Sequence, residues 1–389
     1  MSENNFTIVA KTMAGLESVL AEELKALGAK NIVILPRAVS FYGDKKLLYK
    51  ANLWTRTALR ILKFIKTFNI QNEQDIYKGV YSIDWEEWLS VDNTLAIDTV
   101  INNSFLTHSV FVSQKAKDAI VDQFRHKTGR RPSISLDNPD LRLNIYISGN
   151  NCTLSADSSG ESLHKRGYRK FSLQAPINEV LAAGLIKLAG WNGNSNFVDP
   201  MCGSGTIVIE AALIALNIPP SYYRKIFGFE KWKDFEPDLW NSIKDKVPSL
   251  INNDIENEII GADISPKAIS IAKENIKSVG LQKKIKLFNK PIDVFRPPYN
   301  HGTVITNPPY GERLVTDNIT ELYKLMGNSF KKMYAGYDVW VISSDMQAIK
   351  YIGLHPSKKI QLYNGPLECK LLKFNIYKGS KKLKKSTIL

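Results

Sequence analysis

The feature that most constrains the fold is the regular alternation of strand-like and helix-like segments in the second half of the chain. From about residue 174 onward, short runs of β-branched and other apolar residues alternate with segments whose apolar residues recur at helical spacing. Alternation of this kind builds a parallel sheet with helices on both faces. We therefore predict an α/β fold with a Rossmann-like, doubly wound sheet over residues 173–380.

The first half of the chain carries two smaller patterns. Residues 1–65 alternate strand and helix in the manner of a small ferredoxin-like unit. Residues 66–156 include a strictly alternating strand at 141–148, and we predict a second small α/β domain there. A polar, basic linker over 157–172 and a Lys-rich tail over 381–389 complete the predicted organisation.

The first chemical motif is a strand, a glycine turn and a helix start, which together span residues 197–206 (FVDPMCGSGT). Glycines let the backbone approach a ligand closely, and the helix N-terminus behind them favours anionic groups such as a cofactor carboxylate. The motif is neither a Walker loop nor a full GxGxxG, and an ordinary turn is the plain alternative. We predict that these residues bind a cofactor: Asp199, Pro200, Cys202, Gly203, Ser204, Gly205 and Thr206.

A second acidic residue follows the next predicted strand. Asp263 ends the strand at 259–262, where doubly wound folds place the acid that binds ribose hydroxyls. An insert over about 217–258, rich in Trp, Tyr and Lys, separates it from the glycine turn. A helix N-cap, with Pro266 at the first helical position, is the alternative for this segment. We assign Asp263 and its neighbour Ile264 to the predicted cofactor site.

Asp293 follows the predicted strand at 285–288. Its position along the sheet edge predicts that it accepts a hydrogen bond from an adenine amine of the cofactor. A plain loop carboxylate is the alternative, because only position supports the assignment.

The motif Asn307-Pro-Pro-Tyr310 directly follows an apolar strand and carries the predicted catalysis. An amine conjugated to a purine ring is a poor nucleophile because its lone pair is delocalised. The side-chain oxygen of Asn307 and the carbonyl of Pro308 would accept its N–H bonds and aim the lone pair at a methyl carbon. Tyr310 would stack on an extruded base, and Asn307 would also border the cofactor. We predict Asn307, Pro308, Pro309 and Tyr310 as catalytic residues, with a simple strand-closing turn as the alternative.

The charge balance favours a polyanionic partner. The formal net charge is +14 and the sequence pI is about 9.4. Two basic segments are predicted to contact RNA, although a solvated surface is the commoner fate of such charge runs. The predicted RNA-binding residues are Arg125, Lys127, Arg130, Arg131, Lys165, Arg166 and Arg169. His164, Arg166 and Arg169 would alternatively brace the predicted Rossmann-like domain against the small α/β domain of residues 66–156.

The cysteines and histidines predict neither disulfides nor a metal. Cys152, Cys202 and Cys369 are odd in number and lie far apart, and the five histidines show no metal-ligand spacing. We therefore expect a reducing, cytoplasmic location. We find no apolar run of about 18 residues, so we expect no membrane span.

These motifs together resemble a known family. DPMCGSGT and NPPYGER are similar to the class I S-adenosylmethionine-dependent amino-methyltransferases. The segments 163–169 (LHKRGYR), 228–232 (GFEKW) and 364–370 (NGPLECK) more narrowly resemble the bacterial THUMP-domain 23S rRNA guanine-N2 methyltransferases. The resemblance covers essentially the whole chain. It implies that residues 66–156 form a THUMP RNA-binding domain and residues 173–380 the catalytic domain, with S-adenosylmethionine as cofactor.

The resemblance also implies a product, N2-methylguanosine in 23S rRNA, whereas the NPPY motif alone serves guanine N2 and adenine N6 equally. Some family members carry a second, fused methyltransferase domain, and we expect its activity to be absent here. The expected partner is 23S rRNA or a ribosome assembly intermediate, bound by a monomer. The alternatives are a tRNA guanine-N2 or a nucleic-acid adenine-N6 methyltransferase, and a non-catalytic RNA-binding or ribosome-assembly factor.

Overall fold

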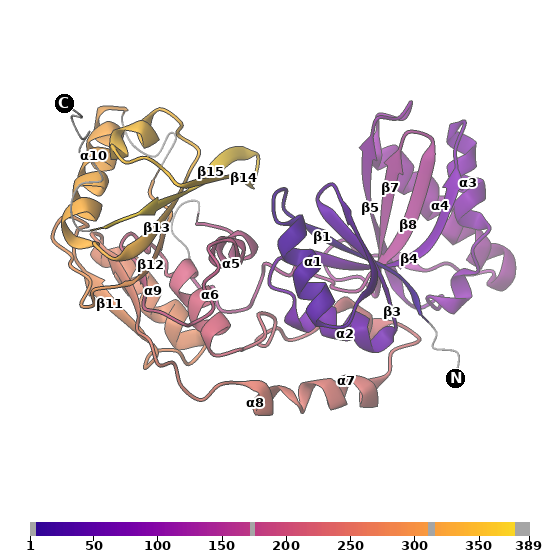
Figure 1. The fold of residues 1–389 in the computed structure, drawn as a ribbon. Coiled ribbons are helices and arrows are strands. Elements are labelled where there is room, and N and C mark those ends of the chain that lie inside the picture. The colour runs from indigo at the N-terminus through magenta and orange to yellow at the C-terminus, as the bar shows by residue number, and fades with distance from the viewer. Residues whose placement is uncertain (1–4, 172–175, 310–315, 378–389) are drawn as a thin grey trace. The chain divides into compact units, whose positions relative to one another are not determined.

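The computed structural model describes residues 5–171, 176–309 and 316–377 (Figure 1). The chain divides into two compact units. The first contains the chain up to residue 167 together with 219–251, and the second contains 168–218 together with the chain from 252 onward. The predicted insert therefore contributes its central part to the first unit, although it interrupts the sequence of the second.

The first unit is built on one eight-stranded sheet, in the order β2-β3-β1-β4-β8-β7-β5-β6. Its strands are β1 (Phe6–Thr12), β2 (Lys30–Leu35), β3 (Ala38–Gly43), β4 (Ala58–Asn69), β5 (Thr94–Asn102), β6 (Ser133–Ile134), β7 (Leu141–Ser148) and β8 (Asn151–Asp157). Its helices include α1 (Glu17–Ala26), α2 (Lys45–Trp54), α3 (Glu73–Tyr81), η1 (Trp85–Glu87), α4 (Ser109–Thr128), η2 (Gly228–Lys231), α7 (Pro237–Lys244) and α8 (Val247–Leu250).

Strand β4 joins the two small patterns that the sequence shows separately. It is 12 residues long, and it pairs with β1 through Ala58 to Lys63 and with β8 through Leu62 to Asn69. Apolar residues from both patterns, such as Ile8 and Leu154, consequently belong to one hydrophobic core. The ferredoxin-like and THUMP-like segments thus share one sheet and one core.

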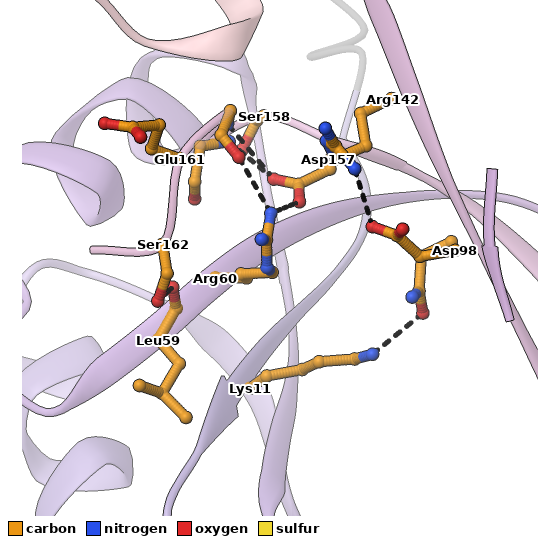
Figure 2. A network of polar contacts seen from close by, with 12 residues as sticks. Lys11, Leu59, Arg60, Asp98, Arg142, Asp157, Ser158, Glu161 and Ser162 are labelled. Atoms are coloured by element: carbon orange, nitrogen blue, oxygen red, sulfur yellow. Dashed lines mark hydrogen bonds and ion pairs between the residues drawn. The ribbon is translucent and has the colours of Figure 1, made fainter. Parts of the chain in front are cut away.

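Polar side chains from five strands form a network that ties the sheet together (Figure 2). Arg60 of β4 pairs with Asp157 of β8, whose carboxyl is 2% exposed, and Arg142 of β7 pairs with Asp98 of β5 at 3.0 Å. Lys11 of β1 donates to the side-chain oxygen Oδ1 of Asn144 on β7 at 2.9 Å. Burial raises the pKa of Asp157, whereas the neighbouring Arg60 acts to lower it.

Aromatic residues of the insert complete the core of the first unit. The ring of Phe229 stacks on Tyr49 of α2 with centroids 4.2 Å apart, and Trp240 meets the same tyrosine edge-on. Trp232 lies edge-on to Trp88. The insert is therefore rich in tryptophan and phenylalanine because it packs into this core.

The second unit holds a seven-stranded sheet in the order β11-β10-β9-β12-β13-β15-β14 (Figure 1). Its strands are β9 (Phe197–Asp199), β10 (Ile259–Asp263), β11 (Ile285–Asn289), β12 (Gly302–Thr306), β13 (Tyr337–Ser343), β14 (Lys358–Asn364) and β15 (Leu367–Asn375). Its helices include α5 (Glu179–Leu188), α6 (Thr206–Ala215), α9 (Pro266–Ser278), α10 (Thr316–Met333) and η4 (Ala348–Ile352).

Strands β11, β10, β9, β12 and β13 run parallel, β15 pairs antiparallel with β13, and β14 pairs antiparallel with β15, so that β15 alone runs opposite to the other strands of this sheet. The order of the strands reverses next to β9, because β10 lies on one side of it and β12 on the other. Ligands of doubly wound folds bind at such a switch point, beyond the carboxyl ends of the strands. The predicted α/β fold is confirmed, and its switch point carries Asp199, Asp263 and Asn307. Across the described ranges we find no helix with the length and hydrophobicity that a membrane crossing requires.

Candidate active site

The glycine loop between β9 and α6 has a backbone that only small residues permit. Gly203 and Gly205 have φ values of 53° and 83°, in the left-handed region. A Cβ atom on Gly205 would also lie 3.2 Å from the Cβ of Ala272, so α9 packs directly against the loop. Cys202 is 7% exposed and faces Gly261, and it supports the loop from within. The glycine loop therefore presents backbone groups, rather than side chains, at the outer edge of the sheet.

Asp263 connects β10 to this loop. Its Oδ2 accepts a hydrogen bond from the backbone N–H of Gly203 at 2.9 Å, and its Oδ1 accepts one from the N–H of Ser265 at 2.9 Å. The N-cap of α9 is Ser265, whose Oγ accepts from the N–H of Ala268, and Pro266 follows at the first helical position. The Asp263 carboxylate therefore faces the glycine loop, and each oxygen retains acceptor capacity for a ribose hydroxyl.

Asp199 is buried beneath the loop, with 1% of its surface exposed. Its Oδ1 accepts hydrogen bonds from the Oγ1 of Thr306 at 2.8 Å and from the N–H of Met201 at 3.1 Å. Burial raises the pKa of Asp199 to about 7, and the charge of Asp263 adds to the shift. Because Thr306 immediately precedes Asn307, Asp199 links the glycine loop to the start of the predicted catalytic loop.

Ile264 and Asp293 lie at the same edge, after β10 and β11. Ile264 is 70% exposed although it follows a buried strand, so it offers an apolar surface to a ring. Asp293 is exposed. Asn289, which the sequence did not single out, donates to the carbonyls of Asp263 at 2.9 Å and of Ile264 at 3.0 Å. The signal that could have identified Asn289 from the sequence is its position as a polar residue at the end of a strand.

Asn307 presents an acceptor that lacks a donor. Its Oδ1 is buried, and within the described ranges it has no hydrogen-bond partner. Pro308, which follows it, is buried, and Pro309 is half-buried. Buried polar atoms are nearly always hydrogen-bonded, so this oxygen fits a donor supplied by a ligand. Tyr310 lies outside the described residues.

The loop at the end of α4 is less free to bind RNA than its composition predicts. Lys127 pairs with Asp84 and Glu86, both at 3.0 Å, and Arg130 pairs with Asp92 at 2.5 Å. Arg125, in the last turn of α4, pairs with Asp122 at 3.4 Å. In the second predicted basic segment, Lys165 pairs with Glu161 at 2.7 Å. Arg131 is exposed, and the described part of the chain shows no ion pair for it.

Two of the predicted RNA-binding arginines have structural partners instead. Arg166 is 1% exposed, and it donates to the carbonyls of Leu163, at 2.8 Å, and of Arg56. Arg169 donates to the carboxylate of Glu179 at 2.7 Å. The prediction that these two side chains contact RNA does not fit this geometry. Each of them instead braces the compact unit to which it belongs.

An open parallel sheet with a glycine loop after β9, an acid after β10 and Asn-Pro-Pro after β12 defines a class I S-adenosylmethionine-dependent methyltransferase. The oxygen of Asn307, which has no partner within the described part of the chain, and the glycine loop fit this cofactor and an amine that accepts its methyl group. Among the described residues we find no cluster of His, Cys, Asp or Glu that would hold a metal.

Family models place the chain more narrowly. The model of the RMKL-like methyltransferase domain matches residues 166–373, that of the THUMP domain 71–157, and that of the RlmL ferredoxin-like domain 7–62. The chain belongs to this family of RMKL-like methyltransferases.

Individual relatives extend over nearly the whole chain. The protein slr0064 of Synechocystis sp. is 38% identical over 373 residues, which are 96% of each chain. "Ribosomal RNA large subunit methyltransferase K/L" of Syntrophotalea carbinolica is also 38% identical, over 93% of this chain but 52% of its own length. The chain thus spans about half the length of that relative. The crystal structure of SMU.472, complexed with SAH, has a TM-score of 0.87 at 31% identity and covers 98% of this chain and 100% of its own.

Proposed function

We propose that this protein transfers the methyl group of S-adenosylmethionine to the exocyclic N2 amine of a guanine in 23S rRNA. The observation that carries the proposal is the buried Oδ1 of Asn307, which has no hydrogen-bond partner among the described residues and lies directly after the residue that bonds to Asp199. An exocyclic amine has two N–H donors, and this oxygen would accept one of them. The carbonyl of Pro308 would accept the other.

Holding both N–H bonds in fixed directions would aim the nitrogen lone pair at the methyl group. Bound S-adenosylmethionine supplies that group as an activated methyl on sulfur. The contribution of Asn307 and Pro308 is then orientation and preorganised electrostatics, because both acceptors are fixed before the amine arrives. The methylated amine can release its extra proton to water, so no general base is required. Pro309 would stiffen the loop, and Tyr310 would stack on the base.

For the cofactor, we assign ribose binding to Asp263 and the methionine carboxylate to the N–H groups of the glycine loop. The loop fits this role because a helix N-terminus favours anions. Ile264 would cover the adenine ring with its exposed side chain, and Asp293 would accept from the adenine amine. Pro200, Cys202 and Ser204 would shape the loop.

The substrate assignment draws on the relatives and on charge. The K/L relatives are named for the large ribosomal RNA, and the family model of a THUMP domain matches residues 71–157. The net charge of +14 favours a polyanion. We propose that residues 66–156 bind 23S rRNA or an assembly intermediate, that residues 173–380 catalyse the reaction, and that the protein acts as a monomer in the cytoplasm. The basic tail, 381–389, lies outside the described residues.

Substitution of Asn307 tests the catalytic assignment. We expect Asn307→Ala to lower methyl incorporation into rRNA by about 100-fold or more, because losing one preorganised polar contact in a transition state typically costs that much. Binding of S-adenosylhomocysteine should persist. Asn375→Ala, which changes an exposed asparagine at the end of β15, is the matched control. A wild-type rate for Asn307→Ala would refute the assignment.

A further inference from the structure

Residues 168–171, which we call the strap, begin the second unit and lie beside the glycine loop. Tyr168 is 1% exposed, and its hydroxyl donates to Glu210 of α6 at 2.9 Å. Ser278 of α9 donates to the carbonyl of Tyr168 at 2.8 Å. The strap is therefore anchored on both helices that follow cofactor-binding segments.

Asn275 of α9 bonds the strap to the glycine loop with one side chain. Its Oδ1 accepts from the N–H groups of Lys170 at 3.1 Å and of Phe171 at 3.4 Å. Its Nδ2 donates to the carbonyl of Phe171 at 3.1 Å and to the carbonyl of Ser204 at 3.1 Å. Asn275 is 2% exposed, and its bond to Ser204 is buried and therefore shielded from water.

Arg169 holds the other end of the same loop. Its Nη2 donates to the Oγ1 of Thr206, the first residue of α6, at 3.1 Å. The same nitrogen donates to the carbonyl of Ile177 at 2.9 Å, and Nε donates to Glu179 at 2.7 Å. The guanidinium of Arg169 is thus held by Ile177 and by Glu179 of α5, and it in turn holds Thr206 at the start of α6.

The two contacts enclose the flexible part of the loop. Gly203 and Gly205 have positive φ values and no side chains, so side-chain packing at these two positions does little to restrict the backbone. Asn275 fixes the carbonyl of Ser204 between these glycines, and Arg169 fixes Thr206 immediately after them. Asn275 and Arg169 therefore add to the hydrogen bond between Gly203 and Asp263 in ordering the loop, and Arg169 belongs to the predicted basic linker.

We propose that Asn275 and Arg169 are positioning residues, which hold the glycine loop in the conformation that binds S-adenosylmethionine. The inference rests on the proposed cofactor site. It gives Arg169 a role in cofactor binding in place of the RNA contact predicted from its charge. Neither side chain need touch the cofactor for this role.

The test is the affinity for S-adenosylhomocysteine, measured by calorimetric titration of the purified full chain. We expect Asn275→Ala to weaken binding by about tenfold, the effect of losing buried hydrogen bonds that preorganise a site. Affinity for an rRNA fragment should remain as in the wild type. Glu274→Gln is the matched control on the same helix, because it changes an exposed neighbour of Asn275 that holds neither the strap nor the glycine loop, and its affinity for S-adenosylhomocysteine should stay within about twofold.

Arg169→Lys provides a second variant if Asn275→Ala does not fold. Lysine keeps the charge beside Glu179 but cannot also reach Ile177 and Thr206 with a planar fork, so it should weaken S-adenosylhomocysteine binding and leave RNA binding unchanged. Unchanged affinity for S-adenosylhomocysteine in a folded variant would overturn the inference, as would a loss of RNA affinity alone. A wild-type chain that fails to bind S-adenosylhomocysteine would instead contradict the proposed function.

Discussion

At the scale of single residues, the buried carboxyl of Asp199 makes the stability of the protein depend on pH. Burial is the main cause that raises the pKa of Asp199 to about 7, whereas the pKa of an aspartate in an unfolded chain is about 4. Between these values the folded chain binds more protons than the unfolded chain. The contribution of Asp199 to stability is therefore largest below about pH 4 and decreases as the pH rises through about 7.

Asp199→Asn removes this titration. Without cofactor, we expect the melting temperature of the variant, relative to that of the wild type, to be higher at pH 8 than at pH 5. Calorimetric melting of both proteins at the two pH values measures the difference. Asp293→Asn, at an exposed carboxyl, is the control. A difference that is independent of pH, or larger at pH 5, would contradict the account.

Single residues also show where sequence is sufficient and where it is not. The glycine loop and the Asn-Pro-Pro motif were predictable because their chemistry depends on neighbouring residues in one short segment. Arg166, Arg169 and Asn275 were not, because their partners include residues 110, 37 and 71 positions away in sequence. Basic character alone does not distinguish an arginine that binds phosphate from one that binds backbone carbonyls.

At the scale of secondary-structure elements, two ion pairs on one sheet differ in how deeply their acid is buried. Asp157 is 2% exposed where Arg60 meets it, whereas the side chain of Asp98 is 50% exposed where it meets Arg142. Removing one partner of a buried pair leaves an uncompensated charge, which costs about 3–5 kcal/mol, whereas exposed pairs contribute about 0–1 kcal/mol.

We therefore expect Arg60→Ala to lower the free energy of unfolding of the chain by about 3 kcal/mol. Arg142→Ala, the matched control, should lower it by less than about 1 kcal/mol. Urea denaturation followed by circular dichroism measures both. Equal losses of unfolding free energy in the two variants would show that the burial of Asp157 does not determine how strongly its ion pair with Arg60 stabilises the protein.

Element boundaries were predictable only in part. The strand expected at 259–262 is extended by one residue in the structure, to Ile259–Asp263. Helix α3 (Glu73–Tyr81) was not predicted, although Asn72 caps it by accepting from Gln74 and the side chain of Asp75 bonds back to the N–H of Asn72. The single long strand β4 could not be recognised as a shared element, because strand pairing is a long-range property.

At the scale of the whole molecule, the net charge of +14 predicts RNA binding that weakens with salt. The loop after α4 offers a direct comparison, because Arg130 is paired with Asp92 and Arg131 shows no ion pair within the described ranges. We expect Arg131→Ala to reduce the slope of log affinity against log salt by about one, as for one lost phosphate contact.

Arg130→Ala removes the same charge from the neighbouring position and should change the slope less. Filter binding of an rRNA fragment at several salt concentrations measures both variants. A larger effect of Arg130→Ala would mean that its pairing with Asp92 does not persist in the complex.

The organisation of the whole chain was harder to predict than its class. The βα alternation is a local pattern, and it was sufficient for the Rossmann-like sheet. The insert at 219–251 belongs to the first unit because Phe229 and Trp240 pack on Tyr49, which lies 180 and 191 positions earlier in the sequence. No local pattern in the sequence predicts such a contact.

The most direct test of the central claim is the identity of the methylated nucleoside. The purified chain would be incubated with methyl-labelled S-adenosylmethionine and with 23S rRNA or tRNA from a strain that lacks the gene, and the RNA would then be digested to nucleosides. We predict label in N2-methylguanosine from 23S rRNA, which Asn307→Ala abolishes. Label in N6-methyladenosine, label confined to tRNA, or no incorporation into any RNA would contradict the proposed function.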